Sequence, residues 1–357
     1  MNRAFLARQW LLRRKDAPAL EAIEHLVGLQ SQAPNPPYIG LWTRLAGFRH
    51  EELSRLIVGR EAVRIALMRS TIHLVSARDC LWLRPLVQSV SERAFNGSYA
   101  KQLAGLDLAE VAAAGRTLVE ERPRTFSELG LELQRRWPDH EAHALSQAIR
   151  TFVPLVQVPP RGLWGERGQA VHTSAQAWLG RPIDESPDTG ELFRRYLAAF
   201  GPASVRDAQA WSGLTGLQAA AERLRPELVT FRDEQSRELF DLPDAPRPEP
   251  ETLAPVRFLP EFDNALLSHA DRSRIIAEEH KPRVFTVNGI IRGTVLIDGF
   301  VGATWKLRRE RTGVAIEVEP FTELTLAQRN DITDEADRLV AFAADGSPLG
   351  VRFISET

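Results

Sequence analysis

Residues 125–173 read TFSELGLELQRRWPDHEAHALSQAIRTFVPLVQVPPRGLWGERGQAVHT. Thr125 and Glu128 have the spacing of a capping box, which predicts the start of a helix that ends near Trp137-Pro138. The elements predicted around it are helices at 108–120, 125–137 and 141–152, strands at 155–158 and 170–173, and a loop, PPRGLWGERG, between the strands. Helix, helix, helix, strand, loop, strand is the order of a winged helix.

The same order of elements recurs on both sides of this unit. The later copy has predicted helices at 191–200, 204–211 and 214–224, the last opened by a capping-box spacing at 215–218, and strands at 229–232 and 238–242. The earlier copy is looser, with predicted helices at 4–14, 19–29, 39–45 and 51–58, a hairpin at 62–76 that turns near Arg69-Ser70, and a helix at 78–95. A recurring order of this kind predicts three tandem winged helices.

The last third of the chain has a different pattern. A proline-rich linker at 244–255 is followed by alternating apolar residues with Asn288-Gly289 and Asp298-Gly299, dipeptides typical of tight hairpins. An antiparallel meander is therefore predicted, with a final helix at 326–343. The fold class is α+β, and the expected regions are a first winged helix at 1–97, a second at 98–186, a third at 187–245 and a β-rich region at 246–357.

Composition limits the kinds of function. The chain has 357 residues, 43% of them apolar, and no apolar run long enough to cross a bilayer, so a cytoplasmic protein is expected. Cys80 is the only cysteine, and HExxH, GxSxG and glycine-rich phosphate loops are absent, so neither a metal nor a cofactor is predicted. Basic residues are 41 Arg and 4 Lys, which fits either a GC-rich genome or contacts to phosphate.

Two glutamines occupy the stretch VGLQSQAPNPPYIGLWTRL at 27–45. The prolines that follow cannot donate backbone hydrogen bonds and disfavour helix before them, so Gln30 and Gln32 are expected at or just after a helix end. If 30–32 is extended, both amides point the same way into one cavity. Glutamines that cap helix carbonyls or face solvent are the alternative.

Further candidates lie on the two wings. Arg69, Thr71 and His73 would share one strand face, although a structural histidine is the alternative. Arg161 and Trp164 lie on the second wing, where a cation and an apolar wedge could enter a minor groove. The alternative is a tryptophan packed over its own hairpin. Asp263, Asn264 and Arg272 belong either to the site or to a buried polar network between the β-rich region and the third winged helix.

Several segments resemble one family of winged-helix DNA glycosylases, the family that includes the azinomycin-resistance enzyme. They are GLQSQAP with LWTRL, LMRSTIHLV, VPPRGLWG, LPEFDNALL and VLIDGFVGATWKL. Gln30-Ser31-Gln32 matches the Q-x-Q form of the family's motif, whereas relatives with a broader substrate range carry Q-x-D. The resemblance implies three winged helices in a C-shape around a DNA channel, with Gln30 and Gln32 as catalytic residues and Arg69, Thr71, His73, Arg161 and Trp164 facing DNA.

The expected reaction follows from the leaving group. A purine alkylated at N7 is already cationic and leaves without protonation, so an oriented amide that places a water beside C1′ would suffice. The expected partner is double-stranded DNA containing alkylated bases, bound by a monomer. Bulky adducts and interstrand crosslinks are candidate substrates, and the sequence does not say which lesion is preferred. The alternatives are a non-enzymatic winged-helix DNA-binding regulator and a protein-interaction scaffold.

Overall fold

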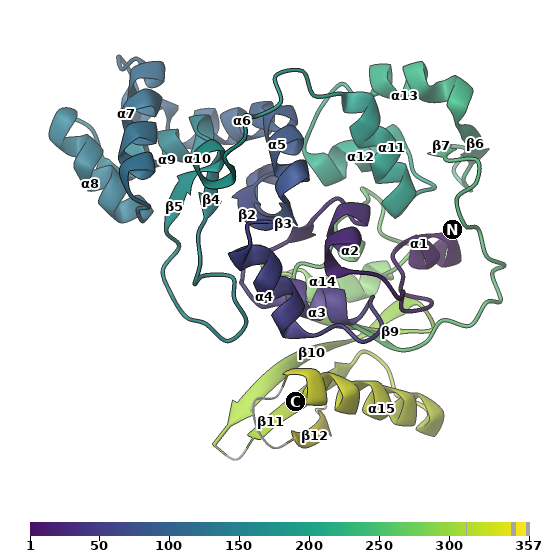
Figure 1. The fold of residues 1–357 in the computed structure, drawn as a ribbon. Coiled ribbons are helices and arrows are strands. Elements are labelled where there is room, and N and C mark those ends of the chain that lie inside the picture. Colours follow the sequence, from purple (N-terminus) through teal and green to yellow (C-terminus); the bar gives the residue numbers. More distant parts are fainter. Residues whose placement is uncertain (312, 344–347, 355–357) are drawn as a thin grey trace.

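The computed structural model describes residues 1–311, 313–343 and 348–354 (Figure 1). Its α-helices are α1 (Asn2–Arg8), α2 (Ala19–His25), α3 (Pro36–Trp42), α4 (His50–Val58), α5 (Ala77–Leu86), α6 (Gln88–Ser98), α7 (Leu108–Glu121), α8 (Phe126–Arg136), α9 (Ala142–Phe152), α10 (Ala175–Leu179), α11 (Thr189–Phe200), α12 (Val205–Ser212), α13 (Gln218–Leu224), α14 (Lys281–Val284) and α15 (Leu326–Ala343). Its strands are β1 (Leu29–Gln30), β2 (Ala62–Ala66), β3 (Ile72–Ser76), β4 (Leu155–Gln157), β5 (His172–Ser174), β6 (Val229–Arg232), β7 (Glu238–Asp241), β8 (Arg257–Leu259), β9 (Gly293–Ile297), β10 (Phe300–Glu310), β11 (Gly313–Pro320) and β12 (Pro348–Phe353). The predicted α+β class is confirmed.

One five-stranded sheet, in the order β1-β3-β2-β4-β5, joins the first two units. The predicted hairpin forms as β2 and β3 and turns at Arg69-Ser70, both of which have positive φ. The wing of the second unit adds to it, because β2 pairs antiparallel with β4 through Arg64–Gln157 and Ile65–Val156. The wings of two predicted repeats are thus parts of one sheet.

The helices of the second and third units lie on opposite sides of the first unit (Figure 1). In the second unit the predicted capping box is confirmed, since Thr125 and Glu128 exchange both hydrogen bonds at the start of α8. This unit has its own hydrophobic core, which includes Val111, Leu129 and Ile149. The core that covers the third unit, by contrast, also contains residues of α1, β2 and α5.

The third unit corrects one prediction. Its capping box lies at Ser204 and Asp207, at the start of α12. The spacing at 215–218 opens no helix, because α13 begins only at Gln218 and Leu217 makes no side-chain cap. Gly213 and Gly216 have positive φ and keep the intervening chain out of the helical region. The strands β6 and β7 form a separate two-stranded sheet.

The C-terminal sheet, in the order β12-β11-β10-β9-β8, confirms only part of the meander. The Asp298-Gly299 turn joins β9 to β10, and α15 has the predicted bounds. The segment before Asn288-Gly289 is not a strand: it is α14 followed by a single bridge between Phe285 and Ile291. The edge strand β12 pairs parallel to β11, because α15 carries the chain back between them.

Three predicted helices are shorter than expected. The helix at 4–14 ends at Arg8 and that at 19–29 ends at His25, since Trp10, Val27 and Gly28 have positive φ. The helix at 78–95 divides into α5 and α6 at Val87, two residues after Pro85, which has no amide hydrogen to donate. The region boundaries at 97, 186 and 245 remain predictions.

No helix in the described ranges is both long and apolar enough to cross a bilayer. Within the same ranges, no group of three His, Cys, Asp or Glu side chains is placed to hold a metal ion.

Candidate active site

The glutamine segment is a short strand that a tight turn places against the hairpin. Gly28 has a φ of 89° and packs so closely that a Cβ there would lie 2.6 Å from Val75 Cγ1. After this turn β1 pairs antiparallel with β3, which puts Gln30 opposite His73. The Ser31 amide then donates to the Ile72 carbonyl at 2.7 Å. Leu29 and Gln30 are therefore extended, whereas Gln32 lies in a bend, and the segment begins well past the end of α2.

Both glutamines use their carbonyl oxygens on the hairpin. Gln30 is buried, and its Oε1 accepts a hydrogen bond from Arg69 Nη2 at 2.7 Å. Gln32 is exposed, and its Oε1 accepts from the Ile72 amide at 3.0 Å. Neither side chain caps α2. A carbonyl oxygen has two lone pairs, so each amide keeps one acceptor position, and the protein donor fixes which end of the amide is the carbonyl.

Arg69 connects Gln30 to the third unit. Its Nη1 donates to the Trp211 carbonyl near the end of α12, and a Cβ at Gly213 would lie 3.3 Å from the Arg69 backbone. The residue keeps some exposed surface, but burial of its guanidinium group, followed by the charge of Arg272, lowers its pKa to about 10. Arg69 is therefore a cation at neutral pH, and among the described residues no carboxylate contacts it.

Thr71 and His73 make contacts inside the hairpin. Thr71 Oγ1 donates to the Met68 carbonyl at 3.0 Å, and His73 Nδ1 lies 3.0 Å from the Thr71 carbonyl. His73 is fully buried, and burial, reinforced by the charge of Arg69, lowers its pKa to about 3. The ring is thus neutral, with Nδ1 donating and Nε2 without a partner among the described residues. This geometry supports the structural alternative for His73.

The loop of the second wing folds back on the first unit. The Trp164 ring stacks on His50 with ring centroids 4.2 Å apart, and it also lies 5.2 Å from Tyr38 and 5.7 Å from Phe342. It therefore packs between α3, α4 and α15 and not over its own hairpin. Arg161 donates to the Gly168 carbonyl within the loop. DNA contacts of Arg161 and Trp164 stay predictions.

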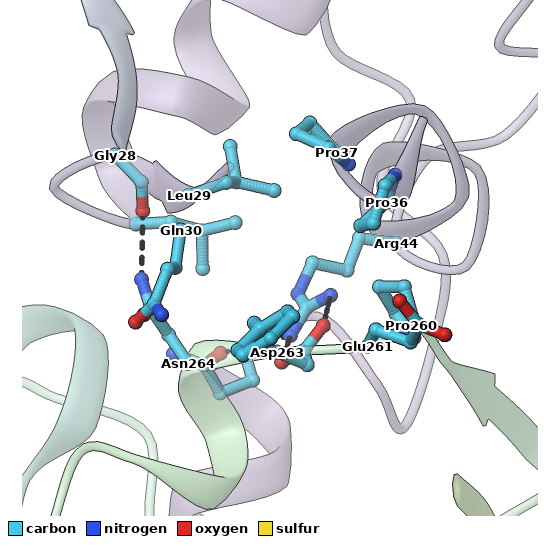
Figure 2. Close-up of a pocket in the computed structure, with 13 residues that line it drawn as sticks. Gly28, Leu29, Gln30, Pro36, Pro37, Arg44, Pro260, Glu261, Asp263 and Asn264 are labelled. Atoms are coloured by element: carbon cyan, nitrogen blue, oxygen red, sulfur yellow. Dashed lines mark hydrogen bonds and ion pairs between the residues drawn. The ribbon is translucent and has the colours of Figure 1, made fainter. Parts of the chain in front are cut away.

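A recess opens beside Gln30 (Figure 2), and we refer to it as the Gln30 recess. Its enclosed space is about 10 Å³, the size of one water. It is lined by Gln9, Leu26, Gly28, Leu29, Gln30, Pro36, Pro37, Arg44, Pro260, Glu261, Phe262, Asp263 and Asn264. Gln32 is not among them, so the two amides do not share one cavity. Partial burial raises the pKa of Glu261 in its wall from the usual value.

Polar contacts hold the walls of this recess together. Arg44 makes a two-pronged ion pair with Asp263, at 2.9 and 2.8 Å, and Asn264 Nδ2 donates to the Gly28 carbonyl at 2.9 Å (Figure 2). Asp263 and Asn264 thus bind the first unit beside Gln30, whereas the alternative, a polar network of these two residues with the third unit, is wrong. The third unit is bound by the residues just after them, where Tyr196 donates to the Ser268 carbonyl and the Ala270 amide to Asp207.

Comparisons with known proteins agree with this architecture. Residues 23–342 match the family described as DNA glycosylase AlkZ-like. The chain belongs to the AlkZ-like DNA glycosylase family. It is also similar to the solved structure of the Streptomyces sahachiroi DNA glycosylase AlkZ, with a TM-score of 0.77 and 21% sequence identity over 99% of this chain and 98% of that one. No curated protein matches the sequence.

Family membership establishes the general activity. An AlkZ-like DNA glycosylase is an enzyme that hydrolyses N-glycosidic bonds in DNA, and this decides between the enzyme and the non-enzymatic regulator that the sequence left open. DNA is its substrate.

Two supports of the motif in this AlkZ-like chain were not predicted. Arg64, buried in β2, donates to Ser31 Oγ at 3.0 Å and to the Ser31 carbonyl at 2.6 Å, between the two glutamines. Asn264 holds Gly28 from the C-terminal region. Arg64 could have been found from one local signal, since it is a charged residue on an otherwise apolar strand, AVRIA. For Asn264 there was no local signal, because its partner lies 236 residues away.

Proposed function

We propose that this AlkZ-like enzyme is a monofunctional glycosylase for N7-alkylated, cationic purines in double-stranded DNA, and that Gln30 and Gln32 position the hydrolytic water. It acts as a monomer. Bulky N7 adducts and interstrand crosslinks formed by DNA-alkylating natural products are included among its substrates. The observation that carries this proposal is the anchoring of both amides: each carbonyl oxygen accepts one hydrogen bond from the hairpin and keeps one lone pair.

The uncharged motif suits a substrate that brings its own charge. Neither Gln30 nor Gln32 is hydrogen-bonded to a carboxylate in the described part of the chain, so neither can pass a proton to a strong base. An undamaged purine needs protonation to leave. An N7-alkylated purine needs only a placed water and a polar environment for the sugar, whose charge grows as the bond breaks.

The chemical step balances without a cofactor. The water oxygen forms a bond to C1′ as the C1′–N9 bond breaks, and the bonding electron pair moves to N9 and neutralises the cationic ring. The base leaves uncharged, and the proton of the water passes to solvent. We place this water between the two amides and outside the Gln30 recess, which Gln32 does not line. The free lone pair of each amide there accepts a hydrogen bond from the water and fixes its direction of attack.

A lyase mechanism through lysine is not part of this proposal. Lys281 is paired with Glu278, and Lys306 is paired with Glu317. We therefore expect no covalent DNA complex that borohydride can trap.

The test is single-turnover release of 7-methylguanine from alkylated duplex DNA. Gln30→Ala and Gln32→Ala should each lower the release rate by about 100-fold or more while the thermal unfolding midpoint stays close to that of the wild type. Gln102→Ala, which removes an exposed amide of the second unit, is the matched control and should act as the wild type. Wild-type rates in both motif variants would contradict the proposal. Loss of release in Glu261→Gln alone would assign the reaction to the carboxylate of the recess instead.

The substrate range needs a separate assay. Duplexes carrying a bulky N7 adduct or an interstrand crosslink are incubated with the enzyme and resolved on denaturing gels. Separation of the crosslinked strands by the wild type, and not by Gln30→Ala, is the expected result. Intact crosslinks after complete release of 7-methylguanine would restrict the range to small lesions.

A further inference from the structure

Arg272 has a guanidinium group that the described part of the protein does not use. The side chain makes no hydrogen bond or ion pair with any described residue, and its Nε is buried without a partner. Its one contact is with an aromatic ring, since the guanidinium carbon lies 4.4 Å from the centroid of Phe285. Partial burial lowers its pKa from the usual value, yet a guanidinium so placed stays charged at neutral pH.

The charge of Arg272 is not compensated by its surroundings. Its electrostatic neighbour is Arg69, whose own pKa it helps to lower. Two acidic residues of the same segment are already engaged: Asp271 accepts from Arg237 and the Ser273 amide, and Asp263 accepts from Arg44. No carboxylate influences the pKa of Arg272, which burial alone lowers. The guanidinium groups of Arg69 and Arg272 thus repel each other, and no carboxylate among the described residues offsets this repulsion.

Arg283 offers a direct comparison. Its guanidinium carbon also lies 4.4 Å from an aromatic ring, that of Phe321, but it forms an ion pair with Glu319 at 3.1 Å. Of these two stacked arginines, Arg283 therefore pairs with a carboxylate, whereas Arg272 has no hydrogen-bonding or ionic partner among the described residues. A partly desolvated cation with unused donors costs free energy, which a bound anion recovers.

We infer that Arg272 binds a backbone phosphate of the DNA strand that lies in the active site. The phosphate diester fits because its oxygens match the fork of the guanidinium, and because every nucleotide of the substrate carries one. Stacking on Phe285 fixes the plane of the guanidinium in advance, which lowers the entropic cost of the contact. The negative charge of the bound phosphate also offsets the repulsion between Arg272 and Arg69.

The location links this contact to catalysis. Arg69 donates to Gln30, so a phosphate held near Arg69 and Arg272 would be linked to the proposed catalytic amide through the guanidinium of Arg69. This step rests on the proposed function, whereas the phosphate contact itself rests on DNA binding by the family.

The test measures binding of an undamaged duplex over a series of salt concentrations. Arg272→Ala should weaken binding about 10-fold and reduce the slope of log Kobs against log salt by about 0.9, the contribution of one phosphate contact. Arg272→Lys should keep the slope, because the charge remains. The matched control, Arg283→Ala, should keep the wild-type slope.

Several outcomes would overturn the inference. A wild-type slope and Kd in Arg272→Ala would do so, as would an equal loss of slope in Arg283→Ala. Arg272→Gln, which keeps most of the side chain over Phe285, guards against misfolding and should repeat the Arg272→Ala result. Failure here is separate from failure of the proposed function, because the assay reads binding alone: an inactive Gln30→Ala protein should show the full wild-type slope.

Discussion

Arg44 and Arg69 each donate to a glutamine, and they differ in what else they touch. Arg44 Nη2 lies 3.1 Å from Gln9 Oε1, and the same guanidinium is neutralised by Asp263. Arg69 Nη2 lies 2.7 Å from Gln30 Oε1, and its other partner is an uncharged carbonyl. The first arrangement is a closed, neutral support, whereas the second leaves a net positive charge beside the motif.

Arg44 is not the only buried arginine that a carboxylate neutralises. The same holds for Arg8–Asp241 and Arg257–Glu335, whereas the buried Arg84 donates to Gln88 and to the Thr151 carbonyl. Arg64, Arg69 and Arg272 lie near the glutamine segment and contact no carboxylate among the described residues. Charge that the protein does not neutralise is charge that a ligand can use. The formal net charge of −2 does not reveal these uncompensated arginines, because it sums the charges of paired and unpaired residues together.

Breaking the neutral support should have the largest effect. Asp263→Ala leaves Arg44 as a buried, unpaired charge and should lower the free energy of unfolding by about 3–5 kcal/mol. Urea denaturation measures the change. Asp298→Ala is the matched control, since its partner Arg3 is buried but the Asp298 side chain is 71% exposed, and it should cost less than about 1 kcal/mol. Equal losses of unfolding free energy in the two variants would show that the buried Arg44–Asp263 pair matters no more for stability than the partly exposed Arg3–Asp298 pair.

Removing the uncompensated charge should affect the reaction more than the fold. Arg69→Ala releases the Gln30 amide, and the single-turnover rate should fall about 10- to 100-fold. If Arg69 acts through Gln30, the double variant Arg69→Ala/Gln30→Ala should be no slower than Gln30→Ala alone. Arg150→Ala is the control, because Arg150 holds the same turn through the Ser70 carbonyl without touching Gln30. Additive losses would show that Arg69 acts elsewhere.

The charge of Arg69 should also be visible in the pH dependence of stability. The pKa of His73 is about 3, because of burial first and of Arg69 second, so the ring is neutral when folded and takes up a proton near pH 6.5 when unfolded. Its contribution is complete above pH 6.5 and is lost as pH falls toward 3. Between pH 7.5 and pH 5 this amounts to about 2 kcal/mol.

Urea denaturation of His73→Asn at both pH values tests this expectation. The wild type should lose more stability on acidification than the variant does, whatever the cost of the substitution at pH 7.5. His143→Asn, an exposed control, should keep the wild-type pH dependence. The same loss in His73→Asn as in the wild type would place the acid sensitivity at other groups.

Local patterns predicted local structure well. The capping box at Thr125, the hairpin that turns at Arg69-Ser70 and the bounds of α15 follow from spacing and periodicity within a few residues of each position. The spacing at 215–218 did not predict a helix start correctly, because Gly213 and Gly216 adopt left-handed conformations there.

Contacts between distant residues left no signal in the sequence. The β2–β4 pairing, the Asn264–Gly28 hydrogen bond and the packing of Trp164 against α15 join segments far apart in the chain. Of the site, the position of Gln30 and Gln32 outside a helix was predicted, whereas their nearness to Arg69 and His73 was not. That the carbonyl oxygens are occupied by Arg69 and the Ile72 amide depends on side-chain geometry, which no spacing encodes.

Pairing of β2 with β4 also limits how the enzyme can move. Rotation of the second unit against the first would break the β2–β4 pairing at Arg64–Gln157 and Ile65–Val156. The two units are therefore expected to move as one rigid body. The third unit shares no strand with them and is joined by the segment between α10 and α11. The third unit nevertheless packs against α1, β2 and α5 in one hydrophobic core. Any adjustment to DNA of a different diameter would therefore have to repack that core, and Arg69, which binds Trp211 across the boundary, would transmit it to Gln30.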